Sequence, residues 1–307
     1  MNPNQKTVVI ICGPTAVGKT SVAIQLAKHF NTAIISADSR QCFKELDIGV
    51  ARPSPEQLKE VPHYFVASHS IRDEVTAISF EQYALQKAKE LFERHDVVVM
   101  AGGTGLYIKA FCEGLDDIPE VSPEVRNRII EKYKEEGMTW LQAEIKEKDP
   151  GFYASGEIQN PQRMMRALEV VDETGQSILS FRKGEKVKRD FAVVKIGLEL
   201  PKEELDRNIQ TRVDQMIKAG LVEETKRLIP FKALNALQTV GYAELFEHFE
   251  DKLTLVQATE AIKIHTRQYA KRQVTWFKRD KEIKWFHPAA IEPENYSQLI
   301  GINLSNP

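Results

Sequence analysis

The chain has 307 residues, of which 42% are hydrophobic, and it carries a formal net charge of −2. This length allows one large domain or two modest ones, and the near-neutral charge excludes a strongly basic nucleic-acid-binding protein, so an anionic polymer would have to meet a local basic patch. The three cysteines stand far apart without metal-ligand spacing, and the first apolar run has only six residues, so we expect a cytoplasmic protein with reduced thiols and no membrane span.

The first 110 residues alternate between strand-like and helix-like segments. Short apolar runs predict buried strands at 7–12, 32–38 and 96–103, and amphipathic patterns predict helices at 19–30 and 80–95. Buried strands separated by helices indicate a parallel sheet with helices on both faces. We therefore predict an α/β fold built on a parallel sheet of the P-loop nucleoside-triphosphate-hydrolase type.

Further along, the pattern becomes helical before it returns to a strand. Capping residues and apolar periodicity predict six helices, at 122–137, 139–150, 160–175, 203–219, 221–229 and 254–278. The apolar run 191–200 predicts a strand that rejoins the sheet. We predict a catalytic core at 1–114 and 190–307, interrupted by a helical insertion domain at 115–189.

The stretch after the first strand has the spacing of a phosphate-binding loop. Two glycines are separated by four residues and are followed by Lys19 and Thr20. In such a loop, backbone N–H groups and a helix amino terminus meet phosphate oxygens, the lysine adds a full positive charge, and the threonine hydroxyl can bind Mg²⁺. The predicted phosphate site comprises Gly13, Pro14, Thr15, Ala16, Val17, Gly18, Lys19 and Thr20, with Thr20 as the magnesium ligand.

Binding a phosphate does not imply hydrolysis of a nucleotide. An ATPase of this type normally has an acid at the end of a buried strand that helps to hold Mg²⁺. Here the apolar strand runs into "AGGTG" without an acid, and Asp96 precedes the strand at its other end. The pattern therefore favours a diphosphate that departs intact over a nucleotide used as fuel.

Two more polar loops follow predicted strands, and the carboxyl ends of parallel strands meet at one edge of a sheet. Asp38 lies in "SADSRQ", where its carboxylate could take a proton from a nucleophile or form an Asx turn, and the residues alone leave both open. Thr104 lies between glycines in "AGGTGLY", which permits close approach by a substrate or an ordinary tight turn. The convergence of three such loops predicts a ligand site at this edge.

The last long helix carries a basic stripe. Lys263, Arg267 and Lys271 recur every four residues, so they share one face. Residues that recur every seven positions and are predicted to pack inward are Ile262, Tyr269 and Trp276. A solvated face is the common fate of such a stripe, but the few acids between Lys263 and Arg279 favour an anionic partner such as RNA.

The insertion domain is also locally basic. It contains Arg126, Arg163 and Arg166, and a run of five further basic residues lies within 182–189. Clusters of this kind in a slightly acidic chain again favour RNA phosphates as the partner.

Together, these stretches resemble the bacterial type of the tRNA dimethylallyltransferase family. The similar stretches follow the family's order from about Gly13 to Phe277: "GPTAVGKT", "SADSRQCFKELDIGVARP", "VPHYF", "AGGTGLY", "NPQRMMRALEV", "RVDQMIKAGLVEE", "VGY" and "RQYAKRQVTWF". The phosphate loop is shared by many families, whereas "SADSRQ" with "AGGTGLY" and "RQYAKRQVTWF" is far more specific.

The resemblance implies a reaction and its substrates. Such enzymes transfer a dimethylallyl group from dimethylallyl diphosphate to N6 of the adenosine 3′-adjacent to the anticodon, in tRNAs reading codons that begin with U. The loop and Mg²⁺ would then hold the diphosphate of the donor, and the bond broken would be carbon–oxygen. The implied partners are dimethylallyl diphosphate and the anticodon stem-loop of tRNA, and we expect a cytoplasmic monomer without membrane association.

The resemblance also implies roles for individual residues. Asp38 would be the general base, and Thr104 would orient the adenine amine. The residues implied to position the target nucleotide are Ser39, Arg40 and Gln41. The insertion residues implied to contact the tRNA are Arg126, Gln162, Arg163, Met164, Met165 and Arg166. Phosphate contacts, to either the diphosphate or the RNA, are implied for Arg267, Lys271 and Arg272.

The sequence departs from the family pattern at three places. Asn160 stands where an Asp is common, Tyr64 stands where a second His is common, and "AE" follows "GY" in place of a more basic pair. We expect these changes to alter RNA contacts or capping and not the chemistry. Three alternatives stay open: a P-loop nucleotide kinase, an isopentenyltransferase that acts on free AMP or ADP, and a non-catalytic RNA-binding module.

Overall fold

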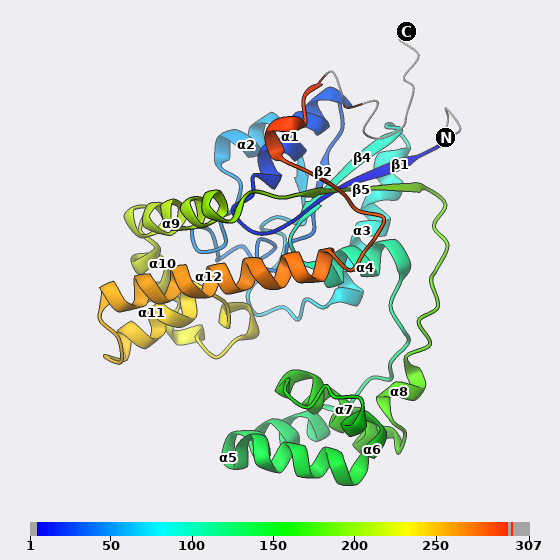
Figure 1. Cartoon of the computed structure of the whole chain (residues 1–307), viewed down its shortest axis with the longest axis vertical. Coiled ribbons are helices and arrows are strands. Elements are labelled where there is room, and N and C mark those ends of the chain that lie inside the picture. The colour runs from blue at the N-terminus through cyan, green and yellow to red at the C-terminus, as the bar shows by residue number, and fades with distance from the viewer. Residues whose placement is uncertain (1–4, 294–295, 297–307) are drawn as a thin grey trace. The chain divides into compact units, whose positions relative to one another are not determined.

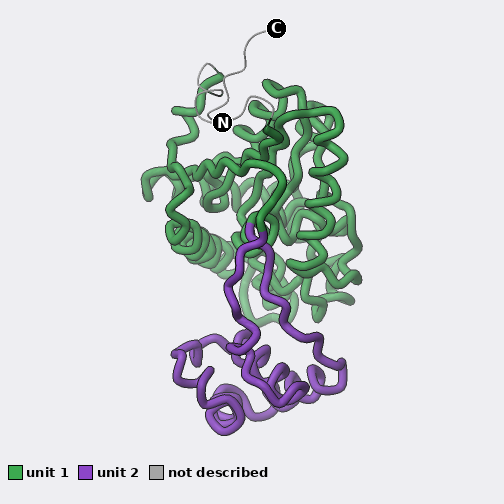
Figure 2. The backbone as a smooth tube through the Cα atoms, turned by 90° about the vertical axis from the view of Figure 1, so that its right-hand side faces the viewer, with its two compact units in different colours: residues 1–112, 188–307 green, residues 113–187 purple. Residues whose placement is uncertain are grey.

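The computed structural model describes residues 5–293 and 296, and the chain divides into two compact units (Figures 1 and 2). The first unit comprises Met1–Cys112 and Lys188–Pro307, and the second comprises Glu113–Val187. The second unit is thus inserted into the sequence of the first, and each has a hydrophobic core of its own. Within the described residues, no helix is long and apolar enough to cross a membrane.

The first unit is built around one parallel sheet with the strand order β3-β2-β4-β1-β5-β6 (Figure 1). The strands are β1 (Thr7–Cys12), β2 (Ile34–Ser36), β3 (His63–Tyr64), β4 (Val97–Gly102), β5 (Ala192–Leu198) and β6 (Lys284–Phe286). β1 and β4 are central and pair in register from Thr7 opposite Val97 to Cys12 opposite Gly102. The predicted parallel α/β sheet is confirmed, and β5 rejoins it beside β1 after the insertion.

Helices cover both faces of this sheet. In chain order they are α1 (Lys19–His29), α2 (Pro55–Glu60), α3 (Ala77–Phe92), α4 (Gly105–Glu113), α9 (Lys202–Lys218), α10 (Leu221–Leu228), α11 (Tyr242–Phe249) and α12 (Leu255–Phe277). Short 3₁₀ helices lie at Ile229–Phe231, Asn235–Leu237 and Pro288–Ala290. Alternate residues of β1 serve the two faces, since Val8 and Ile10 belong to the core with α3, α4, α11 and α12, whereas Val9 and Ile11 belong to the core with α1.

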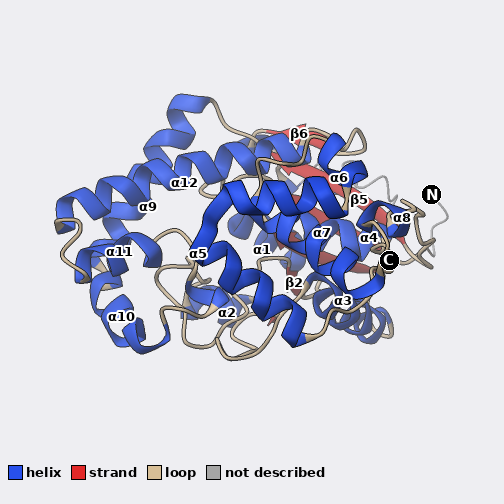
Figure 3. Cartoon of the chain, turned by 90° about the horizontal axis from the view of Figure 1, so that it is seen from below, coloured by secondary structure: helices blue, strands red, loops and turns tan. Residues whose placement is uncertain are grey.

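The second unit is a small helical body, whose helices are drawn blue in Figure 3. Its helices are α5 (Pro123–Lys148), α6 (Pro150–Ala154), α7 (Pro161–Thr174) and α8 (Ile178–Phe181). Gly137 breaks α5 with φ 72° and ψ −157°, so the predicted helices 122–137 and 139–150 are the two halves of one kinked element. Asn160 caps α7 by accepting a hydrogen bond from the Arg163 N–H, and Gly175 ends it in the left-handed conformation.

The first unit contains three helices that were not predicted, α2, α4 and α11, and it differs from the sequence expectations in further features. β3 and β6 were not predicted, because strands of two and three residues that are only partly buried leave no apolar run. Tyr269 does not pack inward with Ile262: its side chain is 38% exposed, whereas Ile262 is 2% exposed. The inward prediction is therefore wrong for Tyr269, because its part of α12 borders cavities instead of the core.

Candidate active site

The phosphate-binding loop connects β1 to α1 at the carboxyl edge of the sheet. Gly13 has φ 139°, and a Cβ at this position would lie 2.6 Å from the Leu198 carbonyl oxygen of β5, so the close approach requires glycine. Gly18 has φ 99° and is the N-cap of α1. The loop therefore places the unpaired N–H groups of the first turn of α1 at this edge.

Lys19 is the first residue of α1 and turns back over the loop. Its Nζ donates to the carbonyl oxygens of Gly13 at 3.1 Å and Pro14 at 2.7 Å. Burial lowers the pKa of Lys19 to about 8, and the nearby carboxylate of Asp38 partly opposes this shift. A bound diphosphate would add negative charge beside the Lys19 ammonium, which burial disfavours.

Two helices from the carboxyl-terminal half of the chain brace the loop. Arg212 of α9 donates from Nη1 to Thr15 Oγ1 at 3.2 Å. Gln273 of α12 is 6% exposed, accepts from the Thr15 N–H at 2.8 Å and donates to the Gly103 carbonyl at 3.0 Å. Gln273 therefore ties the loop after β1 to the loop after β4.

Asp38 follows β2 and uses its two carboxylate oxygens differently. Oδ1 accepts from the backbone N–H groups of Arg40 at 2.9 Å and Gln41 at 3.2 Å, which is the Asx-turn arrangement. Oδ2 makes no hydrogen bond with any residue in the described part of the chain. The turn and a proton-accepting role are thus compatible, since one oxygen holds the loop while the other is available to a ligand.

Thr104, after β4, lies beside this turn. Its Oγ1 accepts from the Ser39 N–H at 3.0 Å and donates to Ser39 Oγ at 3.3 Å. A Cβ at Gly102 would lie 2.1 Å from the Ala37 carbonyl oxygen, so the loops after β2 and β4 approach as closely as glycine allows. The three loops singled out in the sequence do come together at one edge.

Two neighbouring cavities open among these loops. The smaller, of about 260 Å³, is lined by Lys19 and Thr20 among others. The larger, of about 500 Å³, has more apolar walls, which include Met216 and Ile262. Residues that line both cavities are Thr15, Asp38, Val50, Ala51, Arg212 and Tyr269. Asp38 therefore lines both the smaller cavity, which contains Lys19, and the larger, more apolar one.

The wall at residues 48–51 is held in place by Glu224 of α10. This carboxylate is 4% exposed and accepts from the N–H groups of Ile48 at 2.9 Å and Gly49 at 3.0 Å, and from the Tyr242 hydroxyl at 2.6 Å. A Cβ at Gly49 would lie 2.5 Å from the Tyr242 ring. The stretches "GLVEE" and "VGY" thus shape the cavity wall.

The residues expected to position a nucleotide lie around the same cavities. Ser39 and Arg40 line the larger one and Gln41 lines the smaller one. Arg40 also donates to Asn235 Oδ1 at 3.2 Å, and Gln41 donates from Nε2 to the Ala51 carbonyl at 3.0 Å. Gln41 therefore supports the wall as well as facing the cavity.

In the second unit the expected RNA contacts divide into enclosed and surface residues. Met164 and Met165 are 0% and 8% exposed in its core, so their side chains are enclosed by protein and offer no surface to an RNA. Gln162 and Arg163 are exposed, and Arg163 pairs with Glu157 at 2.8 Å. Both remaining arginines meet Glu169, which lies 3.3 Å from Arg166 and 3.8 Å from Arg126.

The basic clusters are more compensated than the local sequence indicates. Lys263 pairs with Asp214 of α9 at 2.9 Å and with Glu260 at 2.8 Å. Arg189 is almost buried and donates to the Phe111 carbonyl at 2.9 Å, so it supports the fold. On α12, Arg267 is half-buried, Lys271 is exposed and Arg272 lines the larger cavity.

The smaller cavity fits a magnesium ion that is bound mainly through a diphosphate. Thr20 lines it and offers a hydroxyl oxygen as a ligand. Among the described residues, no group of three or more His, Cys, Asp or Glu side chains could hold a metal, and Asp96 precedes β4 and pairs with Lys6 at 2.8 Å. Mg²⁺ usually takes one or two protein ligands and completes its shell with phosphates and water, which suits this arrangement.

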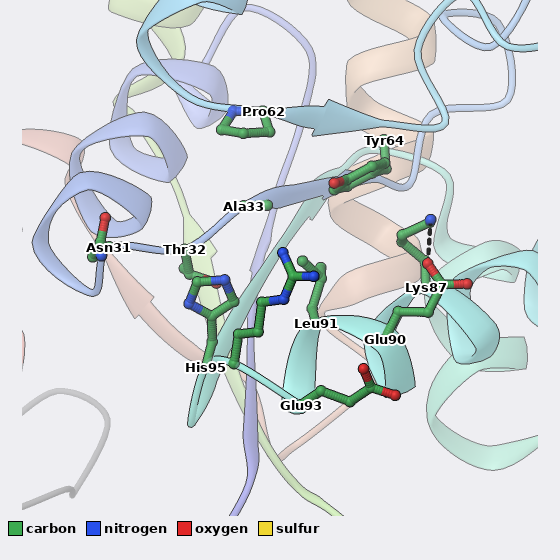
Figure 4. A pocket seen from close by; sticks show the side chains of 11 residues that line it. Asn31, Thr32, Ala33, Pro62, Tyr64, Lys87, Glu90, Leu91, Glu93 and His95 are labelled. Atoms are coloured by element: carbon green, nitrogen blue, oxygen red, sulfur yellow. Dashed lines mark hydrogen bonds and ion pairs between the residues drawn. The ribbon is translucent and has the colours of Figure 1, made fainter.

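A further cavity of about 470 Å³ lies at the opposite edge, where β2, β3 and β4 begin (Figure 4). Its basic Lys87 is paired with Glu90 and lies 4.7 Å from the centre of the Tyr64 ring. This cavity contains none of the three loops and is not part of the site.

The parallel sheet and the glycine loop between β1 and α1 define the class of this protein as a P-loop-like α/β fold. The chain belongs to the IPP transferase family, whose family model matches residues 41–280. It is 50% identical to the tRNA dimethylallyltransferase of Christiangramia forsetii over 90% of this chain and 91% of that one. It is 46% identical to tRNA dimethylallyltransferase 1 of Bacteroides thetaiotaomicron over 92% of each chain.

A solved structure supports the same relationship. The full-length tRNA isopentenylpyrophosphate transferase of Bacillus halodurans superposes with a TM-score of 0.69 at 30% sequence identity, covering 97% of this chain and 95% of that one. The likeness therefore extends over both units of the chain and includes the insertion.

Sequence reasoning missed Arg212, Glu224, Tyr269 and Gln273 as parts of the site. Arg212, Glu224 and Gln273 contact partners that are between 176 and 258 residues away along the chain. The seven-residue spacing of Tyr269 predicted a place in the core instead of a place in the site. The signal that could have found them is their presence within "RVDQMIKAGLVEE" and "RQYAKRQVTWF".

Proposed function

We propose that this chain transfers a dimethylallyl group from dimethylallyl diphosphate to N6 of the adenosine 3′-adjacent to the anticodon, in tRNAs reading codons that begin with U. The family and the names of the relatives, which are tRNA dimethylallyltransferases and a tRNA isopentenylpyrophosphate transferase, support prenyl transfer to tRNA. The observation in this chain that carries the proposal is that Asp38 lines both cavities.

The smaller cavity is the site for the diphosphate of the donor. Lys19, Arg212 and the N–H groups at the start of α1 meet in or beside this cavity and would neutralise the charge that grows on the departing diphosphate. Mg²⁺, held by Thr20 and the diphosphate oxygens, would supply further positive charge to the leaving group. The lack of an acid at the end of β4 fits a site that releases diphosphate intact.

Asp38 is the general base for the acceptor. An exocyclic adenine amine is a weak nucleophile, so its attack on the allyl carbon becomes productive when the carboxylate takes a proton from nitrogen. Oδ1 is committed to the turn, which leaves Oδ2 for this proton. Thr104 and Ser39, hydrogen-bonded to each other beside Asp38, would orient the amine.

The tRNA would be held at two places. The target base must leave its stack to reach the larger cavity, where Arg40 and Arg272 offer positive charge. Surface arginines of the insertion, led by Arg163, would meet backbone phosphates of the anticodon stem-loop. We place the reaction in the cytoplasm and assign it to a monomer.

The test is incubation of the full chain with Mg²⁺ and radiolabelled dimethylallyl diphosphate, with unmodified tRNA, AMP or ADP offered in parallel. We expect label in tRNA, and after digestion in N6-dimethylallyladenosine beside the anticodon. Label in AMP or ADP but not in tRNA would contradict the tRNA assignment. Phosphoryl transfer from ATP to nucleoside monophosphates, with no prenyl transfer, would replace the proposal with a nucleotide kinase.

A further inference from the structure

Tyr269 is the aromatic side chain that borders both cavities. It lies on α12, one turn before Gln273, and is 38% exposed although its helix neighbour Ile262 is buried. Packing alone does not explain a large ring that is partly exposed and lines both cavities.

The two ends of this side chain have different surroundings. Burial of the hydroxyl, followed by the charge of Asp38, raises the pKa of Tyr269 to about 12, so the phenol stays neutral. The guanidinium carbon of Arg272 lies 5.8 Å from the ring centre, so the ring already presents its π face to a cation. The hydroxyl end is therefore near the base, and the ring is oriented to interact with positive charge.

We propose that the π face of Tyr269 stabilises the positive charge that develops on the dimethylallyl group during transfer. The inference rests on the proposed function and adds a catalytic residue to it. The allyl carbon would leave the phosphate cavity of Lys19 for an amine beside Asp38, and Tyr269 is in the wall of both spaces. Apolar side chains of the larger cavity, Val213, Met216 and Ile262, would surround the two methyl groups.

The bond between the allyl carbon and the bridging oxygen of the diphosphate breaks, and its electron pair goes to the diphosphate. The bond between that carbon and adenine N6 forms, and one N6 proton goes to the carboxylate of Asp38. Positive charge is greatest on the allyl group between these events, so a cation–π interaction acts on the transition state and not on the bound donor.

The first test compares Tyr269→Phe with Tyr269→Leu in single-turnover transfer at saturating donor and tRNA. The Phe variant keeps the ring and should keep the wild-type rate within about threefold, because the hydroxyl is not the group that acts. The Leu variant keeps apolar bulk and should lose about 3- to 30-fold in rate with donor affinity unchanged. Ile264→Leu, on the same helix, 45% exposed and outside the lining of both cavities, is the matched control.

A second test removes π character without changing shape. Phenylalanine with one, two and three ring fluorines is incorporated at position 269, which weakens the negative π face step by step. We expect the logarithm of the transfer rate to fall with each fluorine while tRNA affinity and melting temperature stay constant. A role in packing alone would leave the rate flat across this series.

The outcomes separate the inference from the function on which it rests. A flat fluorine series, or a Phe variant as slow as the Leu variant, would overturn the role of the ring while the active wild type sustains the proposed function. A wild type that transfers no dimethylallyl group to any adenosine acceptor would overturn both.

Discussion

Asp38 has a structural role in its turn and, in the proposed reaction, a chemical role as the base. Its Oδ1 holds the turn through the N–H groups of Arg40 and Gln41, and the residue lines both cavities. The sequence left open whether Asp38 forms a turn or accepts a proton. Both roles are compatible, because the carboxylate has two oxygens. A substitution must therefore be chosen so that it removes one role at a time.

Asp38→Asn is the substitution that keeps the turn. The amide oxygen can still accept from the two N–H groups, but it cannot take a proton, so kcat should fall by about 10²–10⁴. Donor and tRNA affinities and the melting temperature should stay near those of the wild type, as measured by binding assays and thermal unfolding. Near-normal turnover in this variant would remove Asp38 from the mechanism.

Asp38→Ala is predicted to add a second effect. It leaves the N–H groups of Arg40 and Gln41 without their acceptor, which should cost about 0.5–2 kcal/mol in the free energy of unfolding. Chemical denaturation of both variants measures the difference. Equal stability of the Asn and Ala variants would show that the turn does not depend on this carboxylate.

Lys19 gives the site a specific pH dependence. Burial lowers its pKa to about 8, whereas a lysine that faces diphosphate holds its proton more tightly. Below pH 8 the lysine is already protonated, but above it binding must take up a proton. The affinity for inorganic diphosphate should therefore fall by up to about tenfold per pH unit above pH 8.

Calorimetric titration between pH 7 and 10 measures this slope. Lys19→Arg is the matched control, because a guanidinium stays charged throughout and should remove the slope. An equal slope in both proteins would assign the proton uptake to another group.

At the scale of elements, α12 connects loops that are far apart in the chain. Gln273 joins the Thr15 N–H to the Gly103 carbonyl, so the helix fixes the phosphate loop relative to the loop that carries Thr104. Gln273→Met removes both contacts and leaves buried polar groups unpaired, which should cost about 1–3 kcal/mol of stability and weaken donor binding.

The matched control is Gln268→Met on the exposed face of the same helix. It should leave stability within about 0.5 kcal/mol of the wild type. Urea denaturation and donor titration of the two variants provide the measurement. A Gln273 variant with the same stability and the same donor affinity as the control would contradict the bracing role of α12.

The elements that were predictable are those with a strong local pattern. β1, β4 and β5 were predicted from apolar runs, and α7 from its capping residues and amphipathic pattern. In each case the signal lies within the element's own sequence. β3 and β6 exist only through pairing with the neighbouring β2 and β5, so no local pattern marked them. Tyr269 was wrongly predicted to pack inward, because a seven-residue spacing places it on one helix face but does not show whether that face meets the core or a cavity.

At the scale of the whole molecule, the three glycine-bearing or acidic loops were predictable and their supports were not. Strand ends of a parallel sheet converge by topology, which is why Lys19, Asp38 and Thr104 could be brought together from the sequence. Arg212 and Gln273 reach Thr15 across 197 and 258 residues, and no local rule links positions so far apart. The sequence therefore predicted the candidate reactive residues, but not the residues that hold their loops in position.

The insertion gives a prediction about the RNA partner. Arg163→Gln keeps a polar surface but removes the charge proposed to meet a phosphate, so tRNA should bind more weakly and the salt slope should fall by about 0.7–0.9. The first unit should keep its donor affinity. Lys28→Gln, on α1 and paired with Glu60, is the control for loss of one surface charge.

Filter binding at several salt concentrations measures both slopes. Loss of affinity with an unchanged slope would indicate a base contact by Arg163 in place of a phosphate contact. An unchanged affinity and an unchanged salt slope would show that the tRNA binds through other residues, such as those of α12.

The central claim is that this phosphate loop holds a leaving group and does not pass on a phosphoryl group. The most direct measurement uses dimethylallyl diphosphate labelled with ¹⁸O at the bridging oxygen between carbon and phosphorus, incubated with the full chain, Mg²⁺ and tRNA. Mass spectrometry should find all of the label in free diphosphate, released in equal molar amount to the prenylated adenosine. Label retained with the prenyl group, or tRNA that gains phosphate instead of carbon, would contradict the account.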